Sequence, residues 1–265
     1  MSLARFRLIT FDVTDTLIRL RSAPGKQYGE LGAYFGIRCD TDDLAINFKS
    51  NWSKMNRAHP NFGRYSNLGW QNWWRELVAK TFRDSGLKTS NDDMIKFSDE
   101  LIEWYKTSAA WQVKYGATEF LNYLKIQQQL RAKGKNNELP LKLGVISNFD
   151  PRLDILLRNM KIDHFFDFII NSYDCRCEKP NPEIFHMAMK TSELQDLKPN
   201  ECLHIGDTPI TDYLGARNCG WFAALVHEKD PDFLIKKYGE KIMYYHCFSS
   251  LFDLHKKMVN DFISW

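Results

Sequence analysis

Short apolar runs, each followed by polar residues, recur along this chain and predict parallel strands. The first spans residues 6–11, where the run LITF is followed at once by Asp12 and a hydroxyl-rich turn. A short run that is rich in branched residues and bounded by turn chemistry predicts a buried strand. Four further runs alternate with helical segments later in the chain, at 142–147, 166–171, 201–206 and 221–227. This alternation predicts βαβ units with right-handed crossovers and a parallel sheet.

Between the first strand and the others, the pattern takes a helical period and contains no convincing strand. Apolar residues from Trp70 to Phe82 recur at i, i+3, i+4, i+7, i+8 and i+12, which places them on one broad helical face. An earlier helix is expected from about Thr41 to Met55, and Ser90 with an aspartate three residues later predicts a capped helix start. The chain is therefore expected to have an α/β fold: a Rossmann-like parallel sheet core with an inserted helical cap over its carboxyl edge.

Two segments of the sheet domain carry marked helix starts. Asp150 and Asn181 each precede a proline, and a cap residue before a proline at the first helical position predicts a helix. Gly220 suits a helix C-terminus. A helix is expected over 117–130, and the polar, turn-rich stretch 127–140 that overlaps its end and leads to the next strand is interpreted as an exposed loop with solvated basic residues.

The helical block contains two features that admit a structural or a functional interpretation. The tryptophans of this block, at helical spacing, favour an aromatic core over a ligand box. The segment 59–67, HPNFGRYSN, has the composition of a loop. It is either a solvated loop or a substrate-contacting loop, and in the second case His59 and Arg64 would bind substrate.

Composition excludes several classes of protein. The 265 residues are 44% hydrophobic and 26% charged with a formal net charge of +3, which gives no support for a nucleic-acid or membrane partner. No apolar stretch has the length of a membrane span and no signal peptide is found, so a cytoplasmic location is expected, with a nuclear one left open. The six cysteines are then expected to be free thiols, and Cys175 and Cys177 lack a second pair in zinc spacing. No oligomeric state is predicted.

The candidate chemistry lies where the predicted strands end. Asp12 is either a helix cap or the chemical centre, and the ends of other strands decide between these. A parallel sheet brings its carboxyl ends together, and the polar residues at or near those ends are Asp12, Ser147, Asn148, Lys179, Asp207 and Asp212. Close carboxylates repel unless a cation or a proton lies between them. An all-oxygen group of this kind suits Mg²⁺.

This set of side chains suits phosphoryl transfer. A carboxylate can attack phosphorus and form an aspartyl-phosphate. Lys179 and Mg²⁺ would neutralise the equatorial oxygens, and the Ser147 hydroxyl would hold one of them. Asn148 and the backbone amide of Thr14 are expected to contact the same substrate.

Four motifs occur in the order FDVTDTL, VISN, EKPNPEIF and GDTPITD, and each lies at the end of a predicted strand or after it. Together they resemble those of the haloacid dehalogenase-like hydrolase superfamily. The resemblance implies that Asp12 is the nucleophile, Ser147 the phosphate-binding hydroxyl and Lys179 the charge stabiliser. It also implies a core of residues 1–18 and 112–265, with residues 19–111 inserted as a helical cap after the first motif.

The resemblance further implies a metal site. Asp12, Asp207 and the backbone carbonyl of Thr14 would be ligands of Mg²⁺, and Asp212 would be either a secondary ligand or a residue that contacts the ligands. Thr14 is also the one departure from the pattern, because phosphatases of this superfamily usually carry there a second aspartate that acts as general acid and base. A local resemblance to the phosphorylation motif of P-type ATPases has threonine at this place. The dehalogenase branch would want an aromatic residue there and no metal, so it is disfavoured.

Two functions remain open on the sequence. The leading one is a Mg²⁺-dependent hydrolase of low turnover acting on a small phosphorylated metabolite through an aspartyl-phosphate. The alternative is a binding protein with little or no activity that keeps the fold and the phosphate pocket, and the absent general acid favours it.

Overall fold

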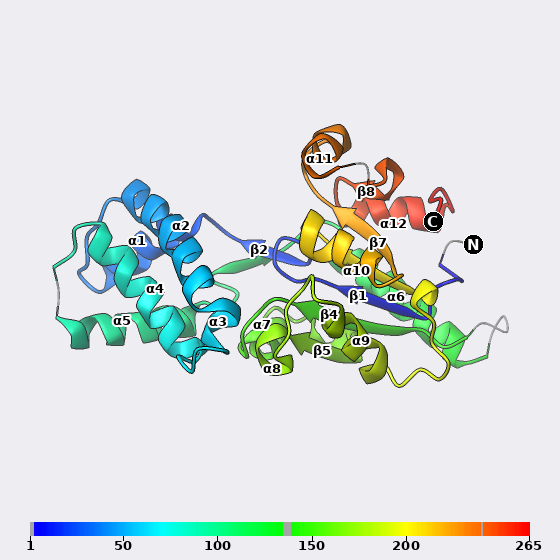
Figure 1. Cartoon of the computed structure of the whole chain (residues 1–265), viewed down its shortest axis with the longest axis horizontal. Coiled ribbons are helices and arrows are strands. Elements are labelled where there is room, and N and C mark those ends of the chain that lie inside the picture. The colour runs from blue at the N-terminus through cyan, green and yellow to red at the C-terminus, as the bar shows by residue number, and fades with distance from the viewer. Residues whose placement is uncertain (1–2, 89, 135–138, 240) are drawn as a thin grey trace. The chain divides into compact units, whose positions relative to one another are not determined.

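Six parallel strands form the sheet around which the larger part of the chain is built (Figure 1). The computed structural model describes residues 3–88, 90–134, 139–239 and 241–265. These residues divide into two compact units: the core unit (residues 1–19, 113–148 and 161–265) and the helical unit (20–112 and 149–160). The strand order in the core unit is β5-β4-β1-β6-β7-β8. The bounds are β1 Leu8–Phe11, β4 Lys142–Ser147, β5 Phe168–Asn171, β6 Cys202–Gly206, β7 Phe222–Val226 and β8 Cys247–Phe248.

The predicted parallel sheet is confirmed, with strand β1 at its centre. β1 pairs in parallel with β4 on one side and β6 on the other. Four of the five predicted strands begin one or two residues later than expected, and the two-residue strand β8 was not predicted. Two further short strands, β2 (Ile18–Leu20) and β3 (Trp111–Val113), form a separate two-stranded sheet where the chain passes between the units.

Alternation along β1 assigns its side chains to the two faces of the sheet, because successive residues of a strand point to opposite sides. Leu8 belongs to a buried cluster that includes Phe185 of α9, whereas the ring of Phe11 contacts Phe120 of α6 at 6.0 Å between centroids. Helices therefore cover both faces. The helices of the core unit are α6 Ala117–Ala132, α8 Ser172–Cys175, α9 Pro182–Thr191, α10 Gly215–Asn218, α11 Pro231–Tyr238 and α12 Leu251–Val259, with a π-helix at Pro209–Leu214.

Helix α6 corrects one prediction. It continues to Ala132, so the expected loop over 127–140 begins later, and its residues 135–138 lie outside the described part of the chain. Arg131 is not solvated but 5% exposed, and it donates to the carbonyls of Phe6 and Leu3 at 2.7 and 2.9 Å. The polar composition of the segment gave no indication that Arg131 is buried, because the carbonyls that accept its hydrogen bonds are distant in sequence.

The helical unit is a bundle with its own apolar core. Its helices are α1 Pro24–Tyr34, α2 Thr41–Ala58, α3 Pro60–Gly63, α4 Trp70–Asp84, α5 Asn91–Trp104 and α7 Leu153–Asn159. The buried cluster at its centre contains Tyr28, Leu44, Val78, Phe82, Met94, Phe97 and Leu101. Gly25 allows α1 and α2 to approach, since a Cβ there would lie 2.5 Å from the backbone of Ala45. The predicted start of α2 at Thr41 and the Ser90 cap of α5 are confirmed.

The segment 59–67 is not the solvated loop of the simpler interpretation. Asn61 and Phe62 adopt left-handed backbone conformations with φ of 49° and 54°. Their side chains are only 3% and 9% exposed, and Phe62 contacts Trp73 at 5.4 Å between ring centroids. The centre of this segment therefore belongs to the aromatic core of the helical unit, while Tyr65 is exposed.

The helix expected after Asp150 begins three residues later, at Leu153. Asp150 is not the cap residue of this helix, which is Arg152. The Asp150 carboxylate is fully buried and accepts from the Arg152 backbone N–H at 3.0 Å and from the Arg152 guanidinium at 2.6 and 2.8 Å. The indole N–H of Trp74 in α4 donates to the same carboxylate at 2.8 Å, and the guanidinium stacks over that indole ring. We call Trp74, Asp150 and Arg152 the indole clasp. It attaches residues 149–160 to the helical unit.

Candidate active site

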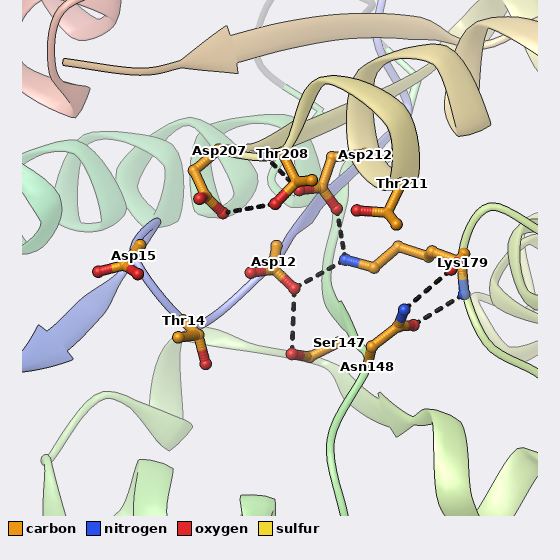
Figure 2. A pocket seen from close by; sticks show the side chains of 10 residues that line it. All are labelled: Asp12, Thr14, Asp15, Ser147, Asn148, Lys179, Asp207, Thr208, Thr211 and Asp212. Atoms are coloured by element: carbon orange, nitrogen blue, oxygen red, sulfur yellow. Dashed lines mark hydrogen bonds and ion pairs between the residues drawn. The ribbon is translucent and has the colours of Figure 1, made fainter. Parts of the chain in front are cut away.

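The register of the central strands brings the predicted residues together at one edge of the sheet. Phe11 pairs with Val145 of β4 and with Ile205 of β6, so the residues that follow these strands are neighbours. Figure 2 shows the resulting pocket, of about 290 Å³. It is lined by Asp12, Thr14, Asp15, Ser147, Asn148, Lys179, Asp207, Thr208, Thr211 and Asp212. Asp12 is thus not a helix cap.

Asp12 lies at the centre of the pocket with its two carboxylate oxygens in different situations. Oδ1 accepts hydrogen bonds from the Ser147 hydroxyl at 3.0 Å and from the Lys179 ammonium at 2.7 Å. Among the described residues no hydrogen bond reaches Oδ2. Burial raises the pKa of Asp12 to about 6, although Lys179 acts in the opposite direction. One oxygen is therefore held by two donors, and the other is left for a ligand.

Lys179 is fixed at both its backbone and its ammonium group. Its Nζ donates to Asp12 at 2.7 Å, to Asp212 at 2.6 Å and to the carbonyl of Ile146 at 2.7 Å, which uses all three N–H groups. The side-chain amide of Asn148 bonds the Lys179 backbone in both directions, at 2.9 and 2.7 Å. Burial lowers the pKa of Lys179, but the charges of the two carboxylates outweigh it and hold that pKa above its ordinary value. The lysine stays charged.

Asn148 therefore has a role that the sequence did not indicate. It was predicted to contact substrate, and it does line the pocket. Both ends of its amide, however, are engaged with the backbone of Lys179 (Figure 2). Its evident task is to position the loop that carries the lysine.

The carboxylates at this edge exceed the positive charge available to them. Oxygen atoms of Asp12, Asp207 and Asp212 lie within 4.8 Å of one another, with the single ammonium of Lys179 beside them. Burial, then the charges of Asp12 and Asp212, raise the pKa of Asp207 to about 8. Burial alone would raise the pKa of Asp212, yet Lys179 and His204 hold it well below its ordinary value.

Such a set fits a small divalent cation. Hard oxygen ligands and excess negative charge are what Mg²⁺ binds. Gly206, at the end of β6, makes the close arrangement possible, since a Cβ there would lie 2.3 Å from the carboxyl carbon of Asp212. Within the described part of the chain, the side chain of Asp207 has only long hydroxyl contacts, at 3.4 Å from Thr16 and 3.5 Å from Thr208. Its oxygens are thus available as ligands.

The turn after Asp12 contains the departure noted in the sequence. Thr14 lines the pocket at the position where a general acid was expected. Asp15 has a left-handed φ of 59°, a conformation that aspartate tolerates better than most residues. Figure 2 shows its carboxylate directed away from Asp12, as expected from the tight turn. Asp15 is exposed at the rim and does not replace the missing acid.

Two groups of residues at the site were missed on the sequence. Thr208 and Thr211 line the pocket, and their place inside the motif GDTPITD was the available signal. Thr10 and His204 lie behind the pocket, fully buried in β1 and β6, and bond each other at 2.8 Å. Burial and the charge of Lys179 lower the pKa of His204 to about 4, so its ring is neutral at pH 7. Thr10 and His204 lie within apolar runs, so the sequence did not mark them as residues of the site.

His59 and Arg64 belong to the helical unit and are not among the residues that line this pocket. Both are partly buried, and His59 bonds the Ser66 hydroxyl at 2.9 Å. Their proposed contact with substrate stays a prediction, as does the backbone carbonyl of Thr14 as a metal ligand.

A doubly covered parallel sheet with an aspartate, a hydroxyl, a lysine and a pair of aspartates at its carboxyl edge defines a class of hydrolase. Comparison with known proteins agrees: residues 6–220 match the haloacid dehalogenase-like hydrolase family, and the chain belongs to that family. The superfamily and the fold predicted from the motifs are therefore confirmed.

Relatives in animals share most of the chain. It is 56% identical to the rhythmically expressed gene 2 protein of Drosophila melanogaster over 266 aligned residues, covering 100% of this chain and 99% of the relative. It is 33% identical to haloacid dehalogenase-like hydrolase domain-containing protein 3 of Xenopus laevis, covering 85% of this chain and 86% of that protein.

Solved structures share the fold at low sequence identity. A putative hydrolase of Bacillus subtilis, bound to magnesium, has a TM-score of 0.66 at 18% identity, with 96% of this chain and 99% of that chain covered. A 2-haloacid dehalogenase of Pseudomonas syringae has a TM-score of 0.61 at 20% identity, with 97% and 99% covered. In the described part of this chain, no helix has the length and apolar character of a membrane span.

Proposed function

We propose that this hydrolase is a Mg²⁺-dependent phosphatase of low turnover that acts on a small phosphorylated metabolite through an aspartyl-phosphate. The observation that carries the proposal is that the two carboxylate oxygens of Asp12 differ in their hydrogen bonding. One oxygen accepts from Lys179 and Ser147, while the other has no hydrogen-bond partner among the described residues. The donors on Oδ1 mark where phosphoryl oxygens would bind, and Oδ2 is the free nucleophile.

The chemistry then follows in two displacements. Oδ2 of Asp12 attacks phosphorus, the bond from phosphorus to the ester oxygen breaks, and the alcohol leaves with a proton taken from water. A water molecule next attacks the phosphorus of the acyl phosphate, which releases inorganic phosphate and restores the carboxylate. Lys179 and Ser147 exchange their hydrogen bonds to Oδ1 of Asp12 for the equatorial oxygens in both steps, and Asn148 keeps the lysine loop in place.

The residues for the cation are Asp12 and Asp207, with Asp212 and the Thr14 carbonyl as further proposed ligands. Bound there, Mg²⁺ would supply positive charge to the transferring phosphoryl group. The shortage of positive charge among the three carboxylates supports this assignment. So does the magnesium in the Bacillus subtilis structure, which has the same fold. A dehalogenase needs no cation, so the carboxylate cluster disfavours that branch.

The test is a turnover assay over a panel of phosphate monoesters, with Asp12→Asn as the control. We expect slow, Mg²⁺-dependent release of phosphate that EDTA abolishes and that Asp12→Asn reduces to the uncatalysed level. A wild-type protein that folds, binds Mg²⁺ and hydrolyses no monoester of the panel would favour the alternative, a phosphate-binding protein of little or no activity. Nucleic acids and membranes are not proposed as partners, and we propose the cytoplasm, with the nucleus left open, as the location.

Thr14 is the observation that favours the alternative, and it can be tested directly. A general acid contributes about 10²–10⁴-fold, and a threonine hydroxyl does not ionise near neutral pH. We expect Thr14→Asp to raise turnover of alkyl phosphates by at least about tenfold, and that of aryl phosphates less, because their leaving oxygen needs little protonation. Mg²⁺ affinity is measured on the same variant. A variant that folds, binds Mg²⁺ normally and is no faster on any ester refutes this account of the low turnover.

A further inference from the structure

A line of buried hydrogen bonds leads from the interior of the sheet to the ammonium of Lys179. Thr10 Oγ1 lies 2.8 Å from His204 Nδ1, and His204 Nε2 lies 3.2 Å from Oδ1 of Asp212. The same oxygen accepts from Lys179 at 2.6 Å. Thr10 and His204 are 0% exposed, and Asp212 and Lys179 are 1% and 2% exposed. The line is thus shielded from bulk water except where Asp212 and Lys179 reach the pocket.

The direction of each bond follows from a count of donors and acceptors. Among the described residues, the only hydrogen-bond partner of the Thr10 hydroxyl is His204 Nδ1, so the buried hydroxyl donates to it. Because Nδ1 accepts, it carries no proton, and the ring proton must then be on Nε2. That nitrogen faces a carboxylate, which can only accept. Thr10 therefore fixes the tautomer in which His204 donates to Asp212.

Asp212 is in turn fully oriented. Oδ1 accepts from His204 and Lys179, and Oδ2 accepts from the backbone N–H of Thr208 at 2.9 Å. Three donors, one from β6 and two from loops, hold one carboxylate. The sequence predicted a role for Asp212 only at the metal site. In the structure, its carboxylate accepts a hydrogen bond from the Lys179 ammonium and so also holds the lysine.

We propose that His204, held in its Nε2–H tautomer by Thr10, is a positioning residue that keeps Asp212 turned toward Lys179 and so orients the lysine ammonium toward Asp12. The catalytic meaning of this line rests on the proposed function, because Lys179 acts there on phosphoryl oxygens. The line itself is a property of the folded chain, and it can be tested without turnover.

The test uses the ammonium protons of Lys179, whose exchange with water is slow only while they are bonded and buried. The signal is observed by ¹H–¹⁵N NMR of the full chain in EDTA at fixed pH and is assigned by its loss in Lys179→Met. In the wild type, the ¹⁵N shifts of His204 should report a bare Nδ1 and a protonated Nε2. The opposite tautomer would overturn the proposal.

Three variants then test the line. His204→Leu removes the donor to Asp212, and we expect ammonium exchange to accelerate at least about tenfold, as the loss of a hydrogen bond to a charged group implies. His204→Gln keeps an N–H at a similar reach and should stay within about threefold of the wild type. Thr10→Val frees the tautomer with little change of shape and should accelerate exchange in the same direction, which keeps the test available if His204→Leu does not fold.

The matched control is His246→Leu. His246 is also buried, at 2% exposure, and also pairs with a hydroxyl, that of Tyr213 at 2.9 Å, but it does not bond Asp212. Its loss should leave Lys179 exchange unchanged. Equal acceleration in His246→Leu and His204→Leu would show general loosening and overturn the proposal, as would unchanged exchange in both His204→Leu and Thr10→Val. If these results hold and no phosphatase activity is found, the proposed function fails and the positioning role stands.

Discussion

Asp207, a proposed metal ligand, is expected to destabilise the folded protein when no metal is bound. Without a cation, burial and three neighbouring carboxylates raise its pKa from 3.8 to about 8. At pH 7 the native state therefore holds Asp207 protonated. Since pH 7 lies about three pH units above the ordinary pKa of an aspartate, keeping this proton bound costs at most about 4 kcal/mol. The side chain is partly exposed and titrates together with Asp12, so we take about 2 kcal/mol as the realistic figure.

Asp207→Asn removes this cost and also the metal ligand. In EDTA at pH 7 the variant should be about 2 kcal/mol more stable than the wild type, which for a chain of this size is a rise in Tm of about 4–8 °C. In Mg²⁺ the order should reverse: the wild type should gain about 2.7 kcal/mol at a hundredfold excess over Kd, and the variant almost nothing. Stability is measured by thermal unfolding in both buffers.

The pH dependence has a definite sign. Because the folded pKa of Asp207 is raised above its unfolded value, the native state binds more protons between about pH 4 and pH 8. The metal-free wild type should therefore lose stability as pH rises through this window, and Asp207→Asn should lose less. The control is Glu100→Gln, which removes an exposed carboxylate of α5 that is not among the charges acting on Asp207. A variant less stable than the wild type in EDTA, or an equal Mg²⁺ response in both, would refute the reasoning.

Other predictions concern the helical unit and a buried histidine. Trp73→Ala should cost about 3–5 kcal/mol in unfolding experiments, since this side chain is fully buried, whereas Arg64→Ala should change stability by less than about 0.5 kcal/mol and should alter KM if the 59–67 segment contacts substrate. Burial lowers the pKa of His246 to about 4, so stability present above about pH 6.5 should be lost as pH falls toward 4. Denaturant titrations at several pH values should show a weaker dependence in His246→Leu, and an equal dependence would contradict this assignment.

The sequence was sufficient for the sheet and the centre of the site because both depend on local patterns. Each strand-end residue, such as Asp12 or Ser147, directly follows an apolar run, and parallel pairing brings such ends together. Asn181 caps α9 as expected, since an Asx cap before proline is decided within a few residues. Predictions that needed only neighbours in sequence were thus mostly accurate, although the same pattern at Asp150 did not place a helix cap.

The errors concern polar groups whose partners are distant in sequence. Arg131 was taken as solvated because its carbonyl partners, at residues 3 and 6, lie more than a hundred positions away. Asp150 was taken as a helix cap because the sequence gives no sign of its indole donor, Trp74, which lies in α4. His204 was hidden within an apolar strand, where nothing marks a side chain that serves a carboxylate eight residues later. Such pairs depend on the register of packed elements, which a local pattern does not contain.

The indole clasp has a consequence for the modularity of the chain. Because residues 149–160 belong to the helical unit, the backbone passes between the two units four times, at 19/20, 112/113, 148/149 and 160/161. An excised fragment of residues 20–112 would leave the Trp74 N–H without its carboxylate and the indole face without its guanidinium. The insertion is therefore not a cassette that can be cut out or exchanged at two points. A graft or a circular permutation of this protein must carry a segment that begins immediately after Asn148.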